Sequence, residues 1–423
     1  MNINDLLKGF SCSCGKHHSC EIRYVYVESG AIARLSSICE NVSRVLIVAD
    51  ENTDQAAGRA TRLALSQQEI NTVLFSGKKL LVPNEAAVRT VTERLGEAQM
   101  IVGIGSGVIQ DLCKYVSFRT GIPYVIVATA PSMDGYASNG AAMITDGMKV
   151  TYSAGLPYAI LGDVDVLKQA PMEMLQAGYG DIVGKFSALN DWKLSHHILG
   201  EYFCPYLYDL TYQQVQATLS LAEGIQKRDE ESIRTLMEAL VVIGIMMSFA
   251  GSSRPASGSE HHLSHFFEIV GLVKQKEYFP HGIDVAYSTV ITARLREDLL
   301  ALPFRCSTYR ISEDRYRREM KRVYGSVAEG CMALQSKAGH YQADRARLYK
   351  EKEDPIKAVL SEVPTAAEIE RMLSLVGLQM DRFYSLYGKD YITDAVWYAK
   401  DLKDRYTVLW LYYDLLGGKN HAE

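Results

Sequence analysis

Side chains that together could bind a metal ion occur in three separate segments of the sequence. His261 and His265 are four residues apart, a spacing that places both rings on one face of a helix. His281 opens the segment His281-Gly282, and Asp181 stands at the expected start of another helix. A lone histidine is more often structural than a ligand. One carboxylate and two imidazoles together form a set of three ligands, which leaves coordination positions open for substrate oxygens. The pattern therefore favours a metal site that combines Asp181 with two of these histidines.

A glycine-rich turn follows the apolar run 100–102 and precedes a helical segment. It reads Gly103-Ile104-Gly105-Ser106-Gly107-Val108-Ile109-Gln110-Asp111. Backbone amides in such a turn can approach a phosphate, and the helix start adds a favourable dipole. Gln110 stands where the dinucleotide fingerprint G-x-G-x-x-G has its third glycine. A phosphate cradle and a plain strand-to-helix turn therefore both stay open.

A polar loop follows the apolar run 124–128. It gathers hydroxyls, a proline and an acid without apolar periodicity: Thr129-Ala130-Pro131-Ser132-Met133-Asp134-Gly135-Tyr136-Ala137-Ser138. Because α/β proteins place ligands in loops at the carboxyl ends of strands, we expect a ligand-binding loop here. A solvated surface loop is the alternative.

Cysteines and histidines alternate near the N-terminus, in Cys12-Ser13-Cys14-Gly15-Lys16-His17-His18-Ser19-Cys20. This composition is compatible with a structural zinc. The sequence shows no second, distant ligand pair, so a mobile, redox-sensitive arm is an equal alternative. We expect this segment to lie outside the active site.

Strands and helices that could position these residues alternate in the first third of the chain. Strands are predicted by the apolar runs 44–49, 72–75, 100–104 and 124–128, and a helix by the spacing in 84–96. The runs 100–104 and 124–128 are apolar throughout, as in parallel strands covered on both faces. The expected fold class is α/β, with an N-terminal Rossmann-like, doubly wound domain over residues 1–165.

Helical patterns dominate the remainder, at 207–227, 230–249, 310–338 and 366–387. They predict an all-helical domain over residues 166–423, with a ligand site in a cleft between the domains. The apolar stretch 239–250 is too short to span a membrane, and we expect a buried helix there.

Composition excludes some classes of protein. The chain has 423 residues, 48% hydrophobic and 22% charged, which is typical of a soluble protein of two to three domains. Its net charge of −5 argues against a nucleic-acid partner. The start Met1-Asn2-Ile3 has no basic stretch leading into an apolar run, and the eight cysteines are expected as thiols. We therefore expect a cytoplasmic protein without a membrane span.

Taken in order, the motifs resemble those of the sn-glycerol-1-phosphate dehydrogenases, and most closely of their bacterial branch. That family lies within the iron-type alcohol dehydrogenase and dehydroquinate synthase superfamily. The motifs are Gly105-Ser106-Gly107 with Asp111, Thr129-Ala130-Pro131-Ser132 with Asp134-Gly135, Gly180-Asp181 with Lys185, Ser257-Gly258-Ser259-Glu260-His261, and His281-Gly282. The resemblance runs from Val45 to Asp404-Arg405-Tyr406-Thr407, nearly the whole chain. Ser106 interrupts what is often a run of glycines.

The resemblance implies a role for each of these residues. Asp181, His261 and His281 would bind one divalent metal ion, with zinc or nickel favoured and iron as a further option. Asp134, Asp181 and His265 would form the catalytic set. NAD or NADP would contact Gly105, Gly107, Val108, Ile109, Gln110, Asp111, Thr129, Ala130, Pro131, Ser132 and Ser138, and Asp50 would accept from an adenosine ribose hydroxyl.

The reaction implied is the reversible, metal-dependent reduction of dihydroxyacetone phosphate to sn-glycerol 1-phosphate, a step of phospholipid metabolism, by a homo-oligomer (a dimer or larger). Lys185 is a candidate partner for the substrate phosphate, with a surface role equally open. Two alternatives stay open within the superfamily: a glycerol or polyol dehydrogenase, and a sugar-phosphate cyclase. Cyclases typically carry glutamate where Asp181 stands. A third alternative is a non-catalytic metal-binding protein on this fold.

Overall fold

Residues 3–78, 81–145, 148–305 and 307–417 are described by the computed structural model of the chain. The backbone contacts divide the chain into two units. The first comprises Met1–Ile182 and Gln216–Ser253, and the second comprises Val183–Val215 and Arg254–Glu423. The division into residues 1–165 and 166–423 stays a prediction.

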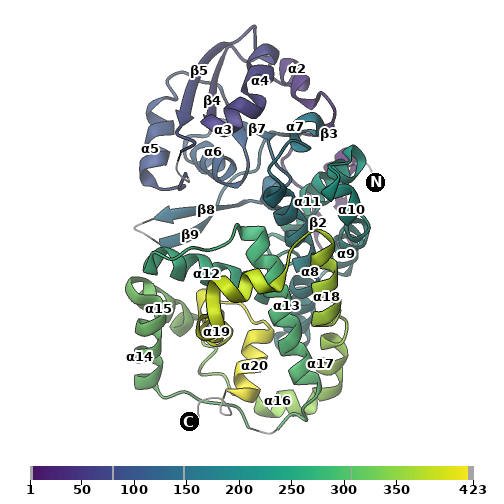
Figure 1. Cartoon of the computed structure of the whole chain (residues 1–423), viewed down its shortest axis with the longest axis vertical. Helices are drawn as coiled ribbons and strands as arrows, with labels where there is room; N and C mark the ends of the chain where they lie inside the picture. The colour runs from purple at the N-terminus through teal and green to yellow at the C-terminus, as the bar shows by residue number, and fades with distance from the viewer. Residues whose placement is uncertain (1–2, 79–80, 146–147, 306, 418–423) are drawn as a thin grey trace. The chain divides into compact units, whose positions relative to one another are not determined.

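A six-stranded, all-parallel sheet lies at the centre of the first unit (Figure 1). Its order is β3 (Tyr24–Glu28), β10 (Ala159–Asp163), β7 (Tyr124–Ala128), β6 (Met100–Gly105), β4 (Arg44–Asp50) and β5 (Glu69–Phe75). The four predicted strands are confirmed as β4 to β7. We missed β3 and β10: β3 is a partly exposed edge strand, and β10 is short and ends in Gly162-Asp163.

Helices cover both faces of the sheet, which confirms the doubly wound class. On one face Val45, Ile47 and Val102 pack against η1 (Ala31–Arg34), α2 (Leu35–Ile38) and α4 (Arg59–Ala64). On the other face α6 (Gly107–Thr120) approaches β6 so closely that a Cβ on Gly103 would lie 2.8 Å from the sulfur of Cys113. The predicted helix in 84–96 is α5 (Glu85–Glu93).

The strand order reverses between β4 and β6. From β4 the chain runs to the edge strand β5 and returns on the other side of β4 as β6. Ala49 is paired with Ile104, and Gly105 with Ala128, so Asp50, the glycine turn and Thr129 leave the sheet at one edge. Ligands of open α/β sheets bind at this reversal point, outside the carboxyl ends of the strands.

Two hairpins and a long helix complete the part of the first unit that matters for function. The hairpins are β1 (Phe10–Ser11) with β2 (His17–His18), and β8 (Gly140–Thr145) with β9 (Met148–Ser153). Helix α11 (Glu230–Ala250) is long and apolar enough to cross a membrane by length and composition. Within the structure, 78% of the most apolar 18-residue segment of this helix is buried, as expected for the stretch 239–250.

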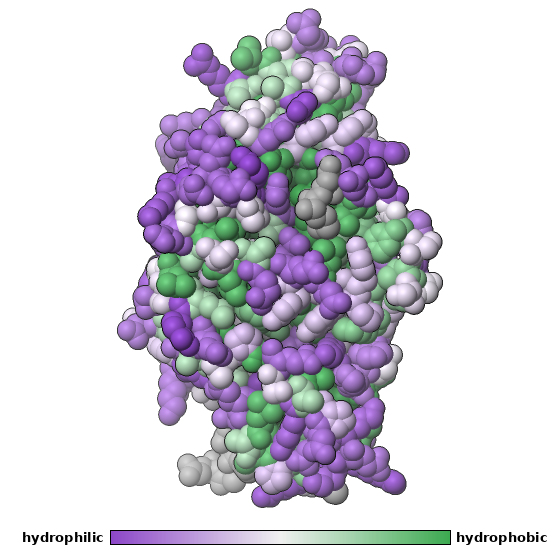
Figure 2. All heavy atoms as spheres, turned by 90° about the vertical axis from the view of Figure 1, so that its right-hand side faces the viewer, coloured by the Kyte–Doolittle hydropathy of each residue, from purple (hydrophilic) through white to green (hydrophobic). Residues whose placement is uncertain are grey.

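Hydrophobic side chains on the surface are scattered. The face in Figure 2 carries mostly hydrophilic residues, interrupted by smaller hydrophobic areas. The large hydrophobic side chains exposed among the described residues are Tyr24, Leu63, Leu74, Phe118, Leu199, Tyr206, Leu272, Leu375 and Tyr384. Other large apolar side chains, such as Trp192 and Trp410, are instead fully buried.

Helices make up the second unit over its described residues. They are the later part of α8 (Met172–Leu199), most of α9 (Pro205–Leu219), and α12 (Ser259–Lys274), α13 (His281–Leu300), α14 (Glu313–Tyr324), α15 (Ala328–Ala338), α16 (Ala346–Glu351), α17 (Glu353–Leu360), α18 (Ala366–Leu375), α19 (Met380–Tyr398) and α20 (Val408–Leu416). The predicted helix at 230–249 is confirmed as α11.

The other three long helices that we predicted are each divided into two. The segment 207–227 becomes α9 and α10 (Ala222–Gln226), 310–338 becomes α14 and α15, and 366–387 becomes α18 and α19. Gly325 and Gly377 stand at two of these breaks with φ of 53° and 83°, values that favour glycine. The apolar spacing continues across each break, so periodicity alone merged the helices.

Cysteines in the described parts of the chain are thiols, as expected: Cys12, Cys14, Cys20, Cys39, Cys113, Cys204 and Cys331. Cys306 lies outside the described residues.

Candidate active site

Asp181, His261 and His281 come close enough to bind one ion. Each offers one ligand atom, and these atoms lie within 4.8 Å of one another. The rings of the two histidines have their centroids 5.1 Å apart. Asp181 and His261 are buried and His281 is half-buried. This donor set fits a divalent metal ion that keeps coordination positions open for substrate.

Three helices carry these candidate ligands. His261 lies in the first turn of α12, and His281 is the first residue of α13. Asp181 lies in the interior of α8, which begins at Met172, so our placement of this residue at a helix start was wrong. Gly178 serves close packing, because a Cβ there would lie 1.8 Å from the carbonyl oxygen of Pro131.

Glu260 orients the ring of His261, a role that our sequence analysis missed. Oε1 of Glu260 lies 2.6 Å from Nδ1 of His261 and also accepts from the N–H of Gly258 at 2.8 Å. Nδ1 therefore donates to a carboxylate, which leaves the Nε2 lone pair for a metal ion. Burial raises the pKa of Glu260, while the Gly258 N–H and the charge of Lys185 act in the opposite direction.

The environment of Glu260 gives this interaction its strength. Glu260 is fully buried, and a charged hydrogen bond is stronger where water is excluded. A glutamate directly before a ligand histidine was visible in the sequence, but its burial was not.

His265 stands beside the two ligand histidines. Its ring centroid lies 5.5 Å from that of His281 and 6.2 Å from that of His261, and the side chain is half-buried. Nδ1 of His281 lies 3.4 Å from the hydroxyl oxygen of Ser264. The three predicted histidines thus form one cluster.

The loop after β7 contacts Asp181 directly. The backbone N–H of Asp134 donates to Oδ2 of Asp181 at 2.9 Å. Thr129, Ala130, Pro131, Ser132 and Asp134 are all buried, so the loop is not the solvated surface loop of the alternative interpretation. Within it, the hydroxyl of Tyr136 donates to the carbonyl of Ala130 at 2.7 Å.

The glycine turn leaves amides available at the start of α6. Gly107, Val108 and Ile109 occupy the first three helical positions, whose N–H groups have no acceptor within a helix. The N–H of Gln110 already donates to Ser106 at 2.9 Å. A Cβ on Gly107 would approach only the side chain of Met133, at 3.8 Å, so glycine here keeps space over those amides. This arrangement fits a phosphate group of a dinucleotide.

Packing explains the other glycine of the turn, Gly105. A Cβ there would lie 2.6 Å from Cβ of Ile109, so α6 could not start where it does.

Two buried side chains of α6 hold the loop that follows Asp134. The amide of Gln110 donates to the carbonyl of Tyr136 at 3.0 Å. Lys114, which we did not single out, donates to the carbonyls of Gly135 and Gly140 at 3.0 and 2.7 Å. Burial lowers the pKa of Lys114, and Asp111, whose carboxylate lies 3.7 Å away, acts in the opposite direction.

Asp50 and Ser138 have local partners. Oδ1 of Asp50 accepts from the N–H groups of Asn52 and Thr53 at 2.8 and 3.0 Å, capping the short helix α3 (Glu51–Thr53). The Ser138 hydroxyl donates to Gly135 at 3.2 Å. Both residues lie in the unit that carries the sheet, and their contacts to a cofactor stay predictions.

Lys185 lies one turn after Asp181 in α8 and is fully buried. The surface role that we left open for it was therefore wrong.

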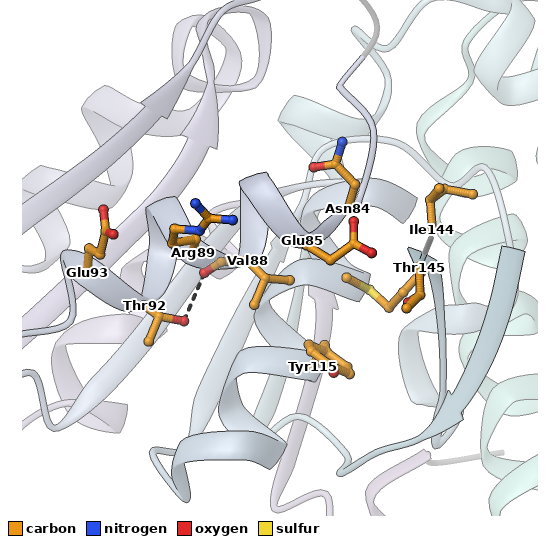
Figure 3. Close-up of a pocket in the computed structure, with 10 residues that line it drawn as sticks. Asn84, Glu85, Val88, Arg89, Thr92, Glu93, Tyr115, Ile144 and Thr145 are labelled. Atoms are coloured by element: carbon orange, nitrogen blue, oxygen red, sulfur yellow. Dashed lines mark hydrogen bonds between the residues drawn. The ribbon is translucent and has the colours of Figure 1, made fainter. Parts of the chain in front are cut away.

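A groove of about 340 Å³ in the first unit is separate from these residues (Figure 3). None of the predicted site residues is among those that line it: Asn84, Glu85, Val88, Arg89, Thr92, Glu93, Tyr115, Met143, Ile144 and Thr145. The hydroxyl of Thr92 donates within α5 to the carbonyl of Val88 at 2.8 Å.

Comparison with known proteins first defines the class. Residues 26–171 match the family described as iron-containing alcohol dehydrogenase. The solved structure of a 1,3-propanediol oxidoreductase aligns with a TM-score of 0.62 at 13% identity, over 93% of this chain and 97% of that one. A maleylacetate reductase from Rhizobium sp. aligns with a TM-score of 0.60 at 12% identity, over 94% and 96% of the two chains. The chain has the iron-type alcohol dehydrogenase fold.

Nearer relatives then define the family. A protein of Halalkalibacterium halodurans named glycerol-1-phosphate dehydrogenase (NAD(P)+) is 30% identical over 96% of this chain and 98% of its own length. Its namesake from Geobacillus thermodenitrificans is 35% identical over 69% of this chain and 73% of its own length. The chain belongs to the glycerol-1-phosphate dehydrogenase family, as its motifs predicted.

Proposed function

We propose that this chain catalyses the reversible reduction of dihydroxyacetone phosphate to sn-glycerol 1-phosphate, with NAD(P)H and one metal ion as cofactors. The observation that carries the proposal is the convergence of Asp181, His261 and His281, with their ligand atoms within 4.8 Å, in a chain of this family.

The metal ligands would be held in position by hydrogen bonds from their own neighbours. A divalent ion at these three residues would supply a Lewis acid for the carbonyl oxygen of the substrate. Glu260 keeps Nε2 of His261 available, and the Asp134 N–H sets the orientation of the Asp181 carboxylate. Such partners typically change metal affinity by about 10- to 100-fold.

His265 would act on the substrate. Its half-buried ring lies beside the ligand histidines, close to where a metal-bound ligand would sit. An imidazole there can donate a hydrogen bond to a substrate hydroxyl, or pass a proton to the oxygen that gains charge during reduction. Asp134 would contact the substrate from the loop after β7.

The nicotinamide cofactor, which supplies the hydride, would bind at the strand-order reversal. The amides of Gly107, Val108 and Ile109, which have no acceptor within α6, would receive its pyrophosphate, together with the predicted contacts of the glycine turn and of the loop 129–138. Asp50 leaves the sheet at the same edge and would accept from the ribose, which would favour NAD over NADP.

Metal identity and assembly belong to the same proposal. A carboxylate with two imidazoles accepts zinc, nickel or iron, and elemental analysis of protein purified without chelator would distinguish them.

We also propose a homo-oligomer, a dimer or larger, measurable by light scattering, and a cytoplasmic location.

The substitution Asp181→Asn tests the proposal. The variant should lose bound metal and should not oxidise NADH in the presence of dihydroxyacetone phosphate, because the neutral amide is a poor ligand. Asp165→Asn, which changes an exposed carboxylate, is the matched control and should keep both properties.

Two outcomes would reject the proposal: full turnover by metal-free Asp181→Asn protein, or a wild-type product with the sn-3 configuration.

A further inference from the structure

A second group of metal-ligating side chains lies apart from the candidate active site. Cys12, Cys14, His18 and Cys204 each offer one ligand atom, and these four atoms lie within 4.8 Å of one another. None of the three cysteines is in a disulfide. We propose that these four residues bind a structural zinc ion.

The spacing of the donors fits tetrahedral zinc. With Zn–S and Zn–N bonds of about 2.3 and 2.0 Å at a tetrahedral angle, sulfur and nitrogen ligands stand about 3.5 Å apart. The sulfur of Cys14 lies 3.4 Å from Nε2 of His18. Three thiolates and one imidazole form a complete structural set, in contrast to the open Asp/His/His set of the active site.

A tight hairpin brings the first three ligands together. Phe10 pairs with His18, the N–H of Cys12 donates to Lys16 at 2.9 Å, and the N–H of Gly15 donates to Cys12 at 3.0 Å. Gly15 has φ of 84°, a value that favours glycine. The turn therefore presents Cys12 and Cys14 beside His18.

His18 is oriented as a metal ligand would be. It is fully buried, and its Nδ1 lies 3.0 Å from the carbonyl oxygen of Phe249. Because that carbonyl can only accept, Nδ1 carries the proton and Nε2 presents its lone pair toward Cys14. The ring also stacks on Phe249, with centroids 5.7 Å apart, so its orientation is constrained.

Cys204 supplies the distant ligand that the sequence of the arm did not show. It is buried and directly precedes Pro205, the first residue of α9. Cys20, which is adjacent in sequence and which we had grouped with the arm, is not among the four converging residues. Thiolate ligands select zinc or copper(I) over magnesium, calcium or manganese.

X-ray absorption at the zinc edge tests the proposal on the whole chain carrying Asp181→Asn, so that the active-site metal does not contribute. The expected result is about one zinc per chain with three sulfur ligands near 2.3 Å and one nitrogen near 2.0 Å. Modification of the thiols should release that zinc.

Ligand variants then assign the site. In the Asp181→Asn background, Cys14→Ser and Cys204→Ser should each lose the zinc equivalent, and Cys20→Ser, the matched control from the same arm, should keep it. The absorption measurement needs no ligand variant, so it remains decisive if these variants misfold.

The proposal is wrong if the Asp181→Asn protein, purified with zinc present, holds no sulfur-ligated metal, or if mass spectrometry finds these cysteines in disulfides. It is also wrong if Cys14→Ser and Cys204→Ser both retain zinc with an unchanged spectrum. None of these results depends on dehydrogenase activity.

Discussion

Single side chains in this site are held in position by hydrogen bonds from neighbouring groups. His261 is held by Glu260, which also accepts from the backbone of Gly258, and Asp181 accepts from the backbone of Asp134. Each of these bonds is buried, where an unmet partner costs about 1–3 kcal/mol. His261 and Asp181, two of the three candidate ligands, are thus held in position by the protein itself.

Gly107 provides a test at the residue scale. A Cβ there meets only Met133 at 3.8 Å, so Gly107→Val should fold with little change in thermal stability. Its side chain would fill the space over the first amides of α6 and should weaken NADH binding at least about tenfold, or 1.4 kcal/mol. Calorimetric titration of NADH measures this effect.

Gly155→Val is the matched control, since nothing lies within 4 Å of a Cβ at Gly155. Unchanged NADH affinity in Gly107→Val would show that the pyrophosphate does not bind at this position.

Whole elements are positioned by close backbone approaches. Gly178 brings α8 against the loop after β7, and Gly244 brings α11 against the same loop, where a Cβ would lie 2.6 Å from the carbonyl oxygen of Asp134. These contacts set where the Asp134 N–H meets Asp181.

Gly178→Ala should displace that loop, because the added Cβ would lie 1.8 Å from the Pro131 carbonyl oxygen. Overpacking of this kind costs about 1–3 kcal/mol of unfolding free energy. We expect a loss of stability together with a raised KM for both NADH and substrate, measured by urea denaturation and steady-state kinetics. Gly155→Ala should change neither, and a stable, fully active Gly178→Ala enzyme would contradict the packing argument.

The N-terminus of α18 gives a prediction about pH. The hydroxyl and the backbone N–H of Thr365 both donate to Glu368 at 2.8 Å, and these bonds lower the pKa of Glu368 from 4.5. A carboxyl whose folded pKa lies below its unfolded pKa stabilises the protein above the unfolded value, and this contribution is lost as the pH falls through the folded value.

Glu368→Gln should therefore lower the free energy of unfolding at neutral pH, and the difference from wild type should shrink below about pH 4.5. Urea denaturation over a pH series measures it, with the exposed Glu329→Gln as control. A difference that is constant with pH would show that the charge of Glu368 is not the cause.

At the scale of the molecule, the two units have different expected responses to cofactor. The predicted nicotinamide contacts belong to the first unit, whereas α14 to α19 belong to the second. A ligand at 100 times its Kd stabilises the structure that binds it by about 2.7 kcal/mol.

NADH should therefore slow hydrogen exchange about 100-fold in β4, β6 and α6, while α14 to α19 change much less. Hydrogen–deuterium exchange followed by mass spectrometry measures both units in one experiment. Equal protection throughout would show that the two units open as a single cooperative body.

The net negative charge of the whole chain does not attract its anionic ligands. A chain with net charge −5 must bind an anionic cofactor and an anionic substrate through local features. The amides at the start of α6, the proposed metal site and buried Lys185 are candidates for those local features.

The sequence alone determined the central strands, the family and the main ligand candidates. Strands β4 to β7 are short apolar runs bounded by polar turns, and Asp181, His261 and His281 stand in motifs that resemble those of one family. Such signals are local, so no long-range contact is needed to read them.

Tertiary structure alone decided which distant residues meet. It placed Asp181 inside a helix, buried Glu260 and Lys185, and brought Cys204 to Cys12, Cys14 and His18 across a long stretch of chain. The physical reason is that burial and side-chain pairing depend on how helices and loops pack. Glycines such as Gly178 and Gly244 allow that packing, but they produce no periodic pattern in the sequence.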